Sequence, residues 1–159
     1  MRTFKNRTVA IVGALALAWS GALISAQPAN AASCSRDSCS NKDPQATGCS
    51  AGSWTQASVD VWAKTGSFPS GNSYAGRLEL RGSNSCGSVQ WARFTPVYGG
   101  FTYKIRAEQP ETGYNTDWQN GGEWQTAWSN QIHSPVKCVR AHIITRTFWR
   151  DLDYYTPCL

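Results

Sequence analysis

The fold is decided by residues 76–93, which read GRLELRGSNSCGSVQWAR. Leu78 and Leu80 alternate with charged residues, which is the period of a strand with one buried face. A Gly/Ser/Asn segment that contains Cys86 follows them and predicts a turn. Residues 89–94 then predict a second strand. The rest of the chain repeats this pattern of short strands, glycine-containing turns and cysteines.

Two further strands are predicted on either side of this pair. Residues 59–64 alternate apolar and polar side chains, and residues 69–72 (PSGN) predict a turn after them. Residues 101–108 have one wholly apolar and one wholly polar face. The Gly-Gly sequence at residues 99–100 predicts a two-residue hairpin loop that joins this strand to the preceding one. Because Pro96 in that preceding strand cannot donate a ladder hydrogen bond, we expect it at a sheet edge or a bulge.

The second half of the chain continues in the same way. Residues 109–123 are polar and predict a connection, residues 124–132 predict a strand, and residues 136–149 predict the last long strand. Residues 148–159 form an aromatic C-terminal extension. No segment has a helical period. We therefore expect an all-β protein, a small disulfide-stabilised sandwich or partly open barrel of about six strands.

Residues 1–31 predict a signal peptide. They contain a basic start, an apolar stretch over residues 9–24 that is short for a membrane span, and the small-residue cleavage site Ala-Asn-Ala at residues 29–31. Residues 32–159 are thus expected to be a single secreted β domain. Of the 15 Lys and Arg, three lie in the signal peptide, so the mature net charge is 12 − 10 = +2. This near-neutral charge disfavours nucleic-acid binding, and no membrane association is expected after cleavage.

All six cysteines lie in the predicted mature part, and an even number in an exported chain predicts three disulfides. Six cysteines allow fifteen pairings, which the sequence leaves open. Pairing of near neighbours gives Cys34–Cys39, Cys49–Cys86 and Cys138–Cys158. Residues 32–53 are poor in apolar side chains, so we expect a loop held by these bonds. The competing interpretation is a metal site, but there is no C-x-x-C pair or matching histidine spacing. We expect no metal and no cofactor.

Several short motifs occur in order along the mature chain. They are the pair Cys34 and Cys39, K-D-P and T-G-C within residues 42–49, L-R-G-S followed by Cys86, and W-A-R at residues 91–93. In these motifs the chain resembles the actinobacterial domain of unknown function 2690, and the resemblance continues through residues 139–141. The third residue of L-R-G-S departs from the aromatic often found in that family, and the C-terminal extension is an addition. The resemblance implies an exported or membrane-tethered domain with the family's fold, and some relatives that carry the domain outside a membrane span suggest sensing or binding. It implies no particular activity, because the family has none assigned.

Three patterns suggest catalysis, and each has a simpler explanation. Residues 48–52 (GCSAG) fit the G-x-S-x-G nucleophile elbow, but that elbow needs a buried strand before it and a helix after it. His133 and His142 would serve a secreted nuclease as acid and base, or be a surface histidine and a hydrogen-bonded strand histidine. Four carboxylates would offer a glycosidase pair or a solvated loop: Glu108, Glu111, Asp117 and Glu123. We assign no catalytic residue.

The seven tryptophans of the mature chain are unusually many for its length. Trp91 and Trp128 are expected in the core, whereas Trp118 and Trp124 lie among glycines and amides, where we expect them to be partly exposed. Aromatic faces flanked by amides suit a sugar or a peptide, while the alternative is that tryptophans fill a sparse core. The candidate ligand-binding residues are Tyr114, Asn115, Trp118, Asn120, Trp124 and Gln125.

The sequence does not single out one function. We expect a secreted, non-catalytic binding or structural module whose partner is a polysaccharide or another cell-envelope component. Two alternatives remain open, namely a small secreted hydrolase and a secreted inhibitor or competition factor that acts on another protein.

Overall fold

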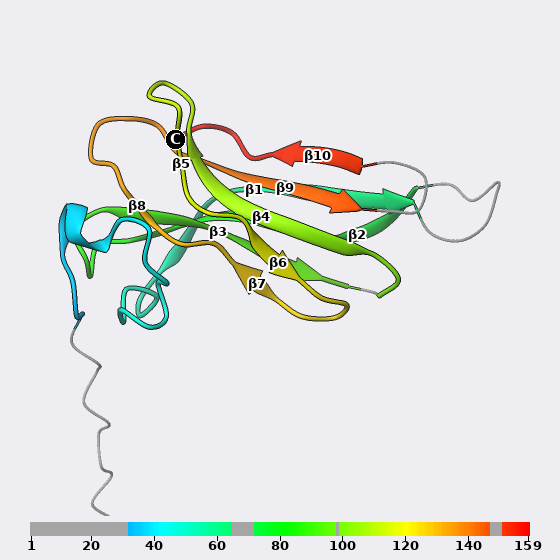
Figure 1. Ribbon diagram of the computed structural model, residues 1–159, viewed down its shortest axis with the longest axis horizontal. Coiled ribbons are helices and arrows are strands. Elements are labelled where there is room, and N and C mark those ends of the chain that lie inside the picture. Colours follow the sequence, from blue (N-terminus) through cyan, green and yellow to red (C-terminus); the bar gives the residue numbers. More distant parts are fainter. Residues whose placement is uncertain (1–31, 65–71, 98, 147–150) are drawn as a thin grey trace, which may run out of the picture.

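The computed structural model describes residues 32–64, 72–97, 99–146 and 151–159, and it shows two antiparallel sheets packed face to face (Figure 1). Sheet A contains β1 (Trp54–Lys64), β2 (Asn72–Ser83), β3 (Val89–Pro96), β7 (Ala127–Trp128) and β8 (Ile132–His133). Sheet B contains β10 (Asp151–Tyr155), β9 (Arg140–Arg146), β4 (Thr102–Gln109), β5 (Tyr114–Asn115) and β6 (Gln119–Gly121). The predicted all-β class is confirmed as an open sandwich. Within the described ranges no helix is long and apolar enough to span a bilayer.

The core lies between the two sheets because the apolar face of each long strand points inward. Leu78 and Leu80 of β2 are fully buried and pair with Phe94 and Ala92 of β3, as the alternation predicts. From sheet B, Tyr103 packs its ring edge-on against Phe94 at a centroid distance of 4.7 Å. Burial of each large apolar side chain contributes about 1.5–3 kcal/mol, so this interface dominates the stability of the domain.

Residues 99–100 do not form the predicted hairpin loop. β3 pairs with β2, β7 and β8, whereas β4 pairs with β5, β6 and β9, so the Gly-Gly sequence connects one sheet to the other. The two strands still contact each other, but across the core. A tight turn would have placed them side by side in one sheet. Pro96 is the last residue of β3, where its missing donor costs little.

Four other segments differ from the prediction. The polar connection 109–123 contains the short strands β5 and β6, and the strand predicted at 124–132 is reduced to β7 and β8. The long strand predicted at 136–149 begins only at Arg140. The C-terminal extension contains β10, which pairs with β9 as an edge strand of sheet B. The sequence pattern did not predict this strand because Asp151 and Asp153 place acidic side chains at alternate positions, although charged residues are typical of an exposed edge strand.

The predicted N-terminal loop has a small hydrophobic core of its own. It consists of the 3₁₀ helix η1 (Arg36–Cys39) and successive turns up to residue 52, and it packs on Trp91 of sheet A. Trp91 is buried as expected, while Trp128 is only half-buried at the margin of this cluster. The disulfides are those given by near-neighbour pairing: Cys34–Cys39, Cys49–Cys86 and Cys138–Cys158. The signal peptide, most of the 69–72 turn and the first residues of the extension lie outside the described ranges.

Candidate functional site

The six candidate ligand-binding residues lie along one edge of sheet B. Strand β5 carries Tyr114 and Asn115 and pairs with the end of β4 at Gln109. Strand β6 carries Asn120 and leads up to the start of β4 at Tyr103. These two ends of β4 are six residues apart, which corresponds to about 20 Å along a strand. The structure therefore arranges the predicted residues in a line and not in one compact cluster.

Trp118 is partly exposed, as predicted, but its ring is already in contact with cations of the same chain. Lys104 Nζ lies 4.5 Å and Arg106 Cζ lies 4.3 Å from the ring centroid, and His142 contacts the ring edge-on at 4.9 Å. Such cation–π contacts hold a ring in place. Trp118 is thus a support of the sheet B surface and not a free stacking platform.

Trp124 is the most exposed aromatic side chain of the site, with 65% of its surface accessible. It lies in the loop after β6 with a φ of 60°, a conformation that is uncommon for a bulky residue and costs backbone strain. Its indole Nε1 lies directly over Gly99, where a Cβ would come within 2.5 Å of it. The next residue, Gln125, is exposed, and its carbonyl accepts a hydrogen bond from the Tyr103 hydroxyl. This bond and the contact with Gly99 fix the loop on sheet B.

A cleft of about 230 Å³ lies between β6, β7 and the N-terminal loop. Its walls are almost entirely hydrogen-bonding side chains and one indole. The lining residues are Asp43, Gln119, Asn120, Thr126, Ala127, Trp128 and Asn130.

Hydrogen bonds to the N-terminal loop hold two side chains of this cleft, Trp128 and Asn130, in place. The Trp128 indole N–H donates to the Asp43 carboxylate at 3.0 Å, which sets the orientation of the ring. The Asn130 amide donates to Asn41 at 3.1 Å, and the Asn41 amide in turn donates to Asp117 at 3.3 Å. Asp43 and Asn41 come from the disulfide-tied loop, so the N-terminal loop completes the cleft. A preorganised set of this kind loses little entropy when a ligand binds.

A second hollow of about 220 Å³ shares Asn120 with the cleft and lies on the other side of β6. Lys104 and Arg146 line it and make it basic. Gly121 also lines this hollow, and a Cβ at this position would lie within 2.4 Å of three atoms of the Tyr103 side chain. The close approach of ring and backbone therefore requires glycine at this position.

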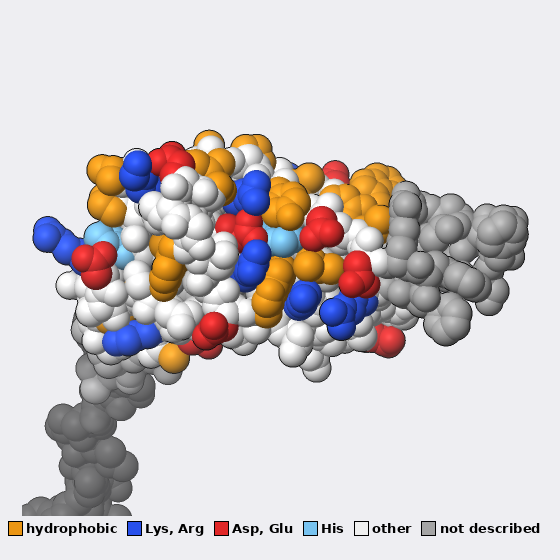
Figure 2. All heavy atoms as spheres, turned by 45° about the horizontal axis from the view of Figure 1, so that its top comes forward, with side chains coloured by type: hydrophobic (Ala, Val, Ile, Leu, Met, Phe, Trp, Pro, Cys, Tyr) orange, Lys and Arg blue, Asp and Glu red, His pale blue; other side chains and the backbone are white. Residues whose placement is uncertain are grey.

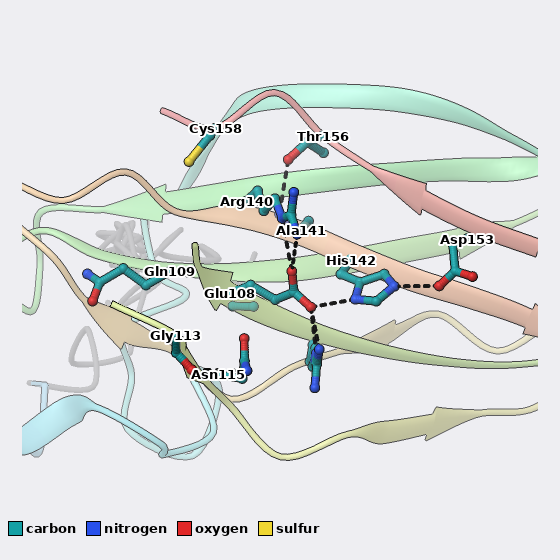
Figure 3. Close-up of polar contacts among 12 residues, drawn as sticks. Glu108, Gln109, Gly113, Asn115, Arg140, Ala141, His142, Asp153, Thr156 and Cys158 are labelled. Carbon is teal, nitrogen blue, oxygen red and sulfur yellow. Dashed lines mark hydrogen bonds and ion pairs between the residues drawn. The ribbon is translucent and has the colours of Figure 1, made fainter. Parts of the chain in front are cut away.

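Glu108 is the centre of a charged cluster on the outer face of sheet B (Figure 3). It is 4% exposed and accepts hydrogen bonds from Arg106 at 2.7 Å, from Arg140 at 2.9 Å and from His142 Nδ1 at 2.5 Å. The other ring nitrogen of His142 lies 2.8 Å from the Asp153 carboxylate. Three neighbouring strands, β4, β9 and β10, thus contribute to one network.

Aromatic and charged side chains surround this network. The ring of Tyr155 stacks on His142 at 4.1 Å, and the Arg140 guanidinium lies 4.1 Å from the Tyr155 ring centroid. Figure 2, in which the β10 side of the molecule is turned forward, shows basic, acidic and hydrophobic side chains interleaved on this face. The mixture leaves no large area of a single charge in this view.

The charged cluster is poorly suited to acid–base catalysis. Burial by itself would raise the pKa of Glu108, but the hydrogen bonds from His142, Arg106 and Arg140 outweigh it and lower the pKa to about 2. Glu108 is therefore ionised at neutral pH and has no proton to give. Both ring nitrogens of His142 contact carboxylates of the same network, so neither is positioned to contact a substrate.

The remaining catalytic patterns are dispersed by the fold. His133 lies on β8 of sheet A, away from His142 in sheet B, and its Nδ1 is 2.6 Å from the Asp37 carboxylate. Its side chain is 11% exposed, so the expected surface histidine is in fact largely covered. Residues 48–52 lie among turns, without the strand before Ser50 and the helix after it that a nucleophile elbow requires. Cys49 is bonded to Cys86.

Within the part of the chain that the structure describes, the four candidate carboxylates do not pair with one another as a glycosidase would require. Glu108 bonds the arginines and the histidine of its cluster, Glu111 pairs with Lys137 at 2.8 Å, and Asp117 accepts a hydrogen bond from Asn41. Glu123 lies in the exposed loop after β6.

The sequence pattern identified Asn120 as a candidate, but not Asp43 and Trp128, which line the same cleft. Asp43 belongs to the K-D-P motif, and Trp128 was expected in the core. Asp43 is 77 positions from Asn120 in the chain, and no local pattern joins them. A comparison with known protein families, curated proteins and solved structures found no match. The resemblance to the domain of unknown function 2690 stays a prediction.

Proposed function

We propose that the chain is a non-catalytic extracellular module that binds polysaccharide in the cleft between β6, β7 and the N-terminal loop. The observation that carries this proposal is the composition of the cleft, which combines amides, a carboxylate and a hydroxyl with a fixed indole. A sugar presents hydroxyl groups that both donate and accept hydrogen bonds, and an apolar ring face that packs on aromatic side chains. The cleft offers partners for both properties.

The size of the cleft favours a small unit of a longer chain. Its volume of about 230 Å³ is below the range of about 300–1,000 Å³ typical of sites that enclose a whole drug-sized ligand. The exposed aromatic and amide groups continue from the cleft along β4, with Tyr114 at one end and Trp124 at the other. An extended polymer would contact this line over about 20 Å, as judged from the strand rise.

Charge and chemistry also support binding without catalysis. The net charge expected for the mature domain is +2, and the outer face of sheet B carries both signs, so a polyanion would gain little. The carboxylate that lines the cleft, Asp43, accepts a hydrogen bond from the Trp128 indole, and in the separate charged cluster His142 bonds Glu108 and Asp153. Three disulfides are compatible with an oxidising extracellular setting, where cell-wall and environmental glycans are the abundant polymers.

The test is a pull-down on insoluble peptidoglycan, chitin and cellulose, with soluble sugar measured in the supernatant. We expect retention on at least one polymer without release of sugar. Asn120→Ala and Trp124→Ala should each reduce retention about tenfold, which is the effect of losing about 1.4 kcal/mol of contact. Asn84→Ala and Trp54→Ala are matched controls, since both side chains are exposed and line neither hollow.

Three results would overturn the proposal. If the wild-type protein is retained on none of the three polymers, the cleft does not bind polysaccharide. If soluble sugar is released in proportion to protein, the molecule is a hydrolase and not a binding module. Equal losses in the Asn120 and Trp124 variants and in their controls would place binding elsewhere on the surface.

A further inference from the structure

Four of the six sulfur atoms form one cluster under the N-terminal loop. Cys34 Sγ lies 3.7 Å and Cys39 Sγ lies 4.0 Å from Cys49 Sγ, although the first two belong to one disulfide and the third to another. With Cys86, all four sulfurs lie within 4.8 Å of one another. One of these disulfides joins residues 5 positions apart and the other joins residues 37 positions apart, and neither has to contact the other to stabilise the fold.

The spacing of the cluster is close to that of a metal site. A tetrahedral Zn²⁺ site has Zn–S distances of about 2.3 Å, and its sulfurs are therefore about 3.8 Å apart along each edge of the tetrahedron. The contacts of 3.7 and 4.0 Å between the two disulfides already match such an edge. Opening each S–S bond to the same spacing would move a sulfur by about an ångström, which a change of side-chain torsion supplies.

Two polar side chains are aimed at the same sulfurs. Gln131 is fully buried, and its amide nitrogen lies 3.4 Å from Cys49 Sγ and 3.7 Å from Cys34 Sγ. The Thr47 hydroxyl lies 3.1 Å from Cys49 Sγ. A disulfide sulfur is a weak acceptor, whereas a thiolate accepts a charge-assisted hydrogen bond. The Gln131 amide nitrogen also donates to Thr47 Oγ1 at 3.2 Å, whereas within the described residues its Oε1 has no hydrogen-bond partner. A thiolate acceptor for the second N–H would offset part of the cost of burying this oxygen.

Backbone hydrogen bonds hold the segments of the cluster together independently of the disulfides. The Arg36 amide donates to the carbonyl of Cys86 at 2.7 Å, and the Ser33 amide donates to the carbonyl of Thr47 at 2.9 Å. The Asn41 amide donates to the carbonyl of Gln131 at 2.8 Å. The three parts of the chain that carry the cysteines are therefore positioned by the fold itself. Reduction alone does not remove these contacts.

We propose that Cys34, Cys39, Cys49 and Cys86 form a tetrahedral thiolate site for a thiophilic divalent cation, Zn²⁺, when the two disulfides are reduced. A dithiol reductant supplies two electrons and two protons to each disulfide and is itself oxidised to a disulfide. The four resulting thiols lose four protons when they bind one Zn²⁺. The Gln131 amide donates hydrogen bonds to sulfurs that bind the ion and so stabilises the thiolates. The reduced chain thus gains a metal cross-link in place of two covalent ones.

This site is independent of the proposed polysaccharide cleft. It uses no residue of the cleft, and it concerns the chain before its disulfides form or after a reductant opens them. A disulfide oxidant that takes two electrons from each pair of thiolates, and takes up two protons to become a dithiol, re-forms the two bonds and so releases the ion. The third disulfide, Cys138–Cys158, closes at the C-terminus and belongs to neither the cluster nor the cleft.

The experiment titrates the reduced, anaerobic full chain with Co²⁺ and then displaces it with Zn²⁺. Two double variants give a matched comparison, because each retains four cysteines. Cys138→Ser/Cys158→Ser keeps the cluster, whereas Cys34→Ser/Cys39→Ser keeps the same number of thiols without it. We expect the first variant to bind one Co²⁺ per chain, with the visible bands of tetrahedral cobalt and a thiolate charge-transfer band. The second variant should bind at least about 100-fold more weakly.

Further measurements separate a built site from non-specific thiol binding. Gln131→Leu in the background of the first variant should weaken Co²⁺ binding about tenfold while keeping all four thiols. Thermal unfolding of the reduced first variant should move to a higher temperature when Zn²⁺ is added, since an ion that binds only the folded chain stabilises it. Equal affinity of the two double variants, fewer than four thiolates per metal, or binding that leaves the unfolding temperature unchanged would each overturn the proposal.

Discussion

The charged cluster around Glu108 makes a quantitative prediction about stability. We expect Glu108→Gln to reduce the free energy of unfolding at pH 7 by about 2–3 kcal/mol. The substitution keeps the size of the side chain but removes the charge that balances Arg106, Arg140 and His142. Removal of one partner from a buried ion pair costs about 3–5 kcal/mol. The two arginines are partly exposed, 24% and 33%, so water compensates part of their charge and the expected cost falls to about 2–3 kcal/mol.

The pKa of Glu108 leads to a similar magnitude by a separate route. A carboxyl group whose pKa falls from 4.5 in the unfolded chain to about 2 in the folded protein stabilises the fold by about 3 kcal/mol at neutral pH. Because the folded pKa is the lower one, this contribution is fully present above about pH 4.5 and is lost as the pH falls from there to about 2. The wild type should therefore lose more stability than Glu108→Gln in this range.

Urea unfolding followed by tryptophan fluorescence, with the disulfides intact, measures both effects. The matched control is Glu111→Gln, because Glu111 pairs with Lys137 at an exposed position and should cost no more than about 1 kcal/mol. The reasoning is refuted if the two variants lose the same stability at pH 7. It is also refuted if the stability of Glu108→Gln falls between pH 4.5 and 2 as steeply as that of the wild type.

Three further predictions concern packing, cross-linking and processing. Gly121→Ala should destabilise the protein by about 1–3 kcal/mol because the new Cβ overlaps the side chain of Tyr103. The control Gly122→Ala should cost less in thermal unfolding, because its Cβ meets only the flexible side chain of Gln125. Loss of the bond between Cys138 and Cys158, which closes a loop of 20 residues, should cost about 3 kcal/mol in urea unfolding, and an unchanged midpoint would contradict it. Intact mass of protein recovered from culture medium should place the N-terminus at or near Ala32, and a chain that retains its first residues would show that no signal peptide is removed.

Local pattern was sufficient for most of the long strands. Residues 76–81, 89–94 and 102–108 lie in strands β2, β3 and β4. In β2 and β4 the side predicted to be apolar is buried, whereas β3 is buried on both sides. This works because successive side chains of a strand point to opposite faces, so an alternating sequence fixes which face is inside. Near-neighbour pairing of the cysteines also agreed with the structure, since short loops between cysteines bring their ends together readily.

The local sequence did not determine which strands pair with each other. The Gly-Gly sequence at residues 99–100 favours a hairpin, yet β3 and β4 lie in opposite sheets. An apolar face can be buried by a strand beside it or by a sheet above it, and the choice depends on all the other strands. The edge strand β10 was missed for a related reason, because its alternation of Asp151 and Asp153 with larger residues became a strand only through pairing with β9.

The sequence by itself determined the residue types of this protein's surface, and the tertiary structure decided which of them meet. Asn120 and Trp124 were identifiable as unusual polar and aromatic neighbours, but Asp43, which completes the cleft with Asn120, comes from a different part of the chain. Glu108, His142 and Asp153 likewise meet because three strands pair in one register, and a shift of one residue would point them to opposite faces. Contacts of this kind depend on long-range register and packing, which no short stretch of sequence contains.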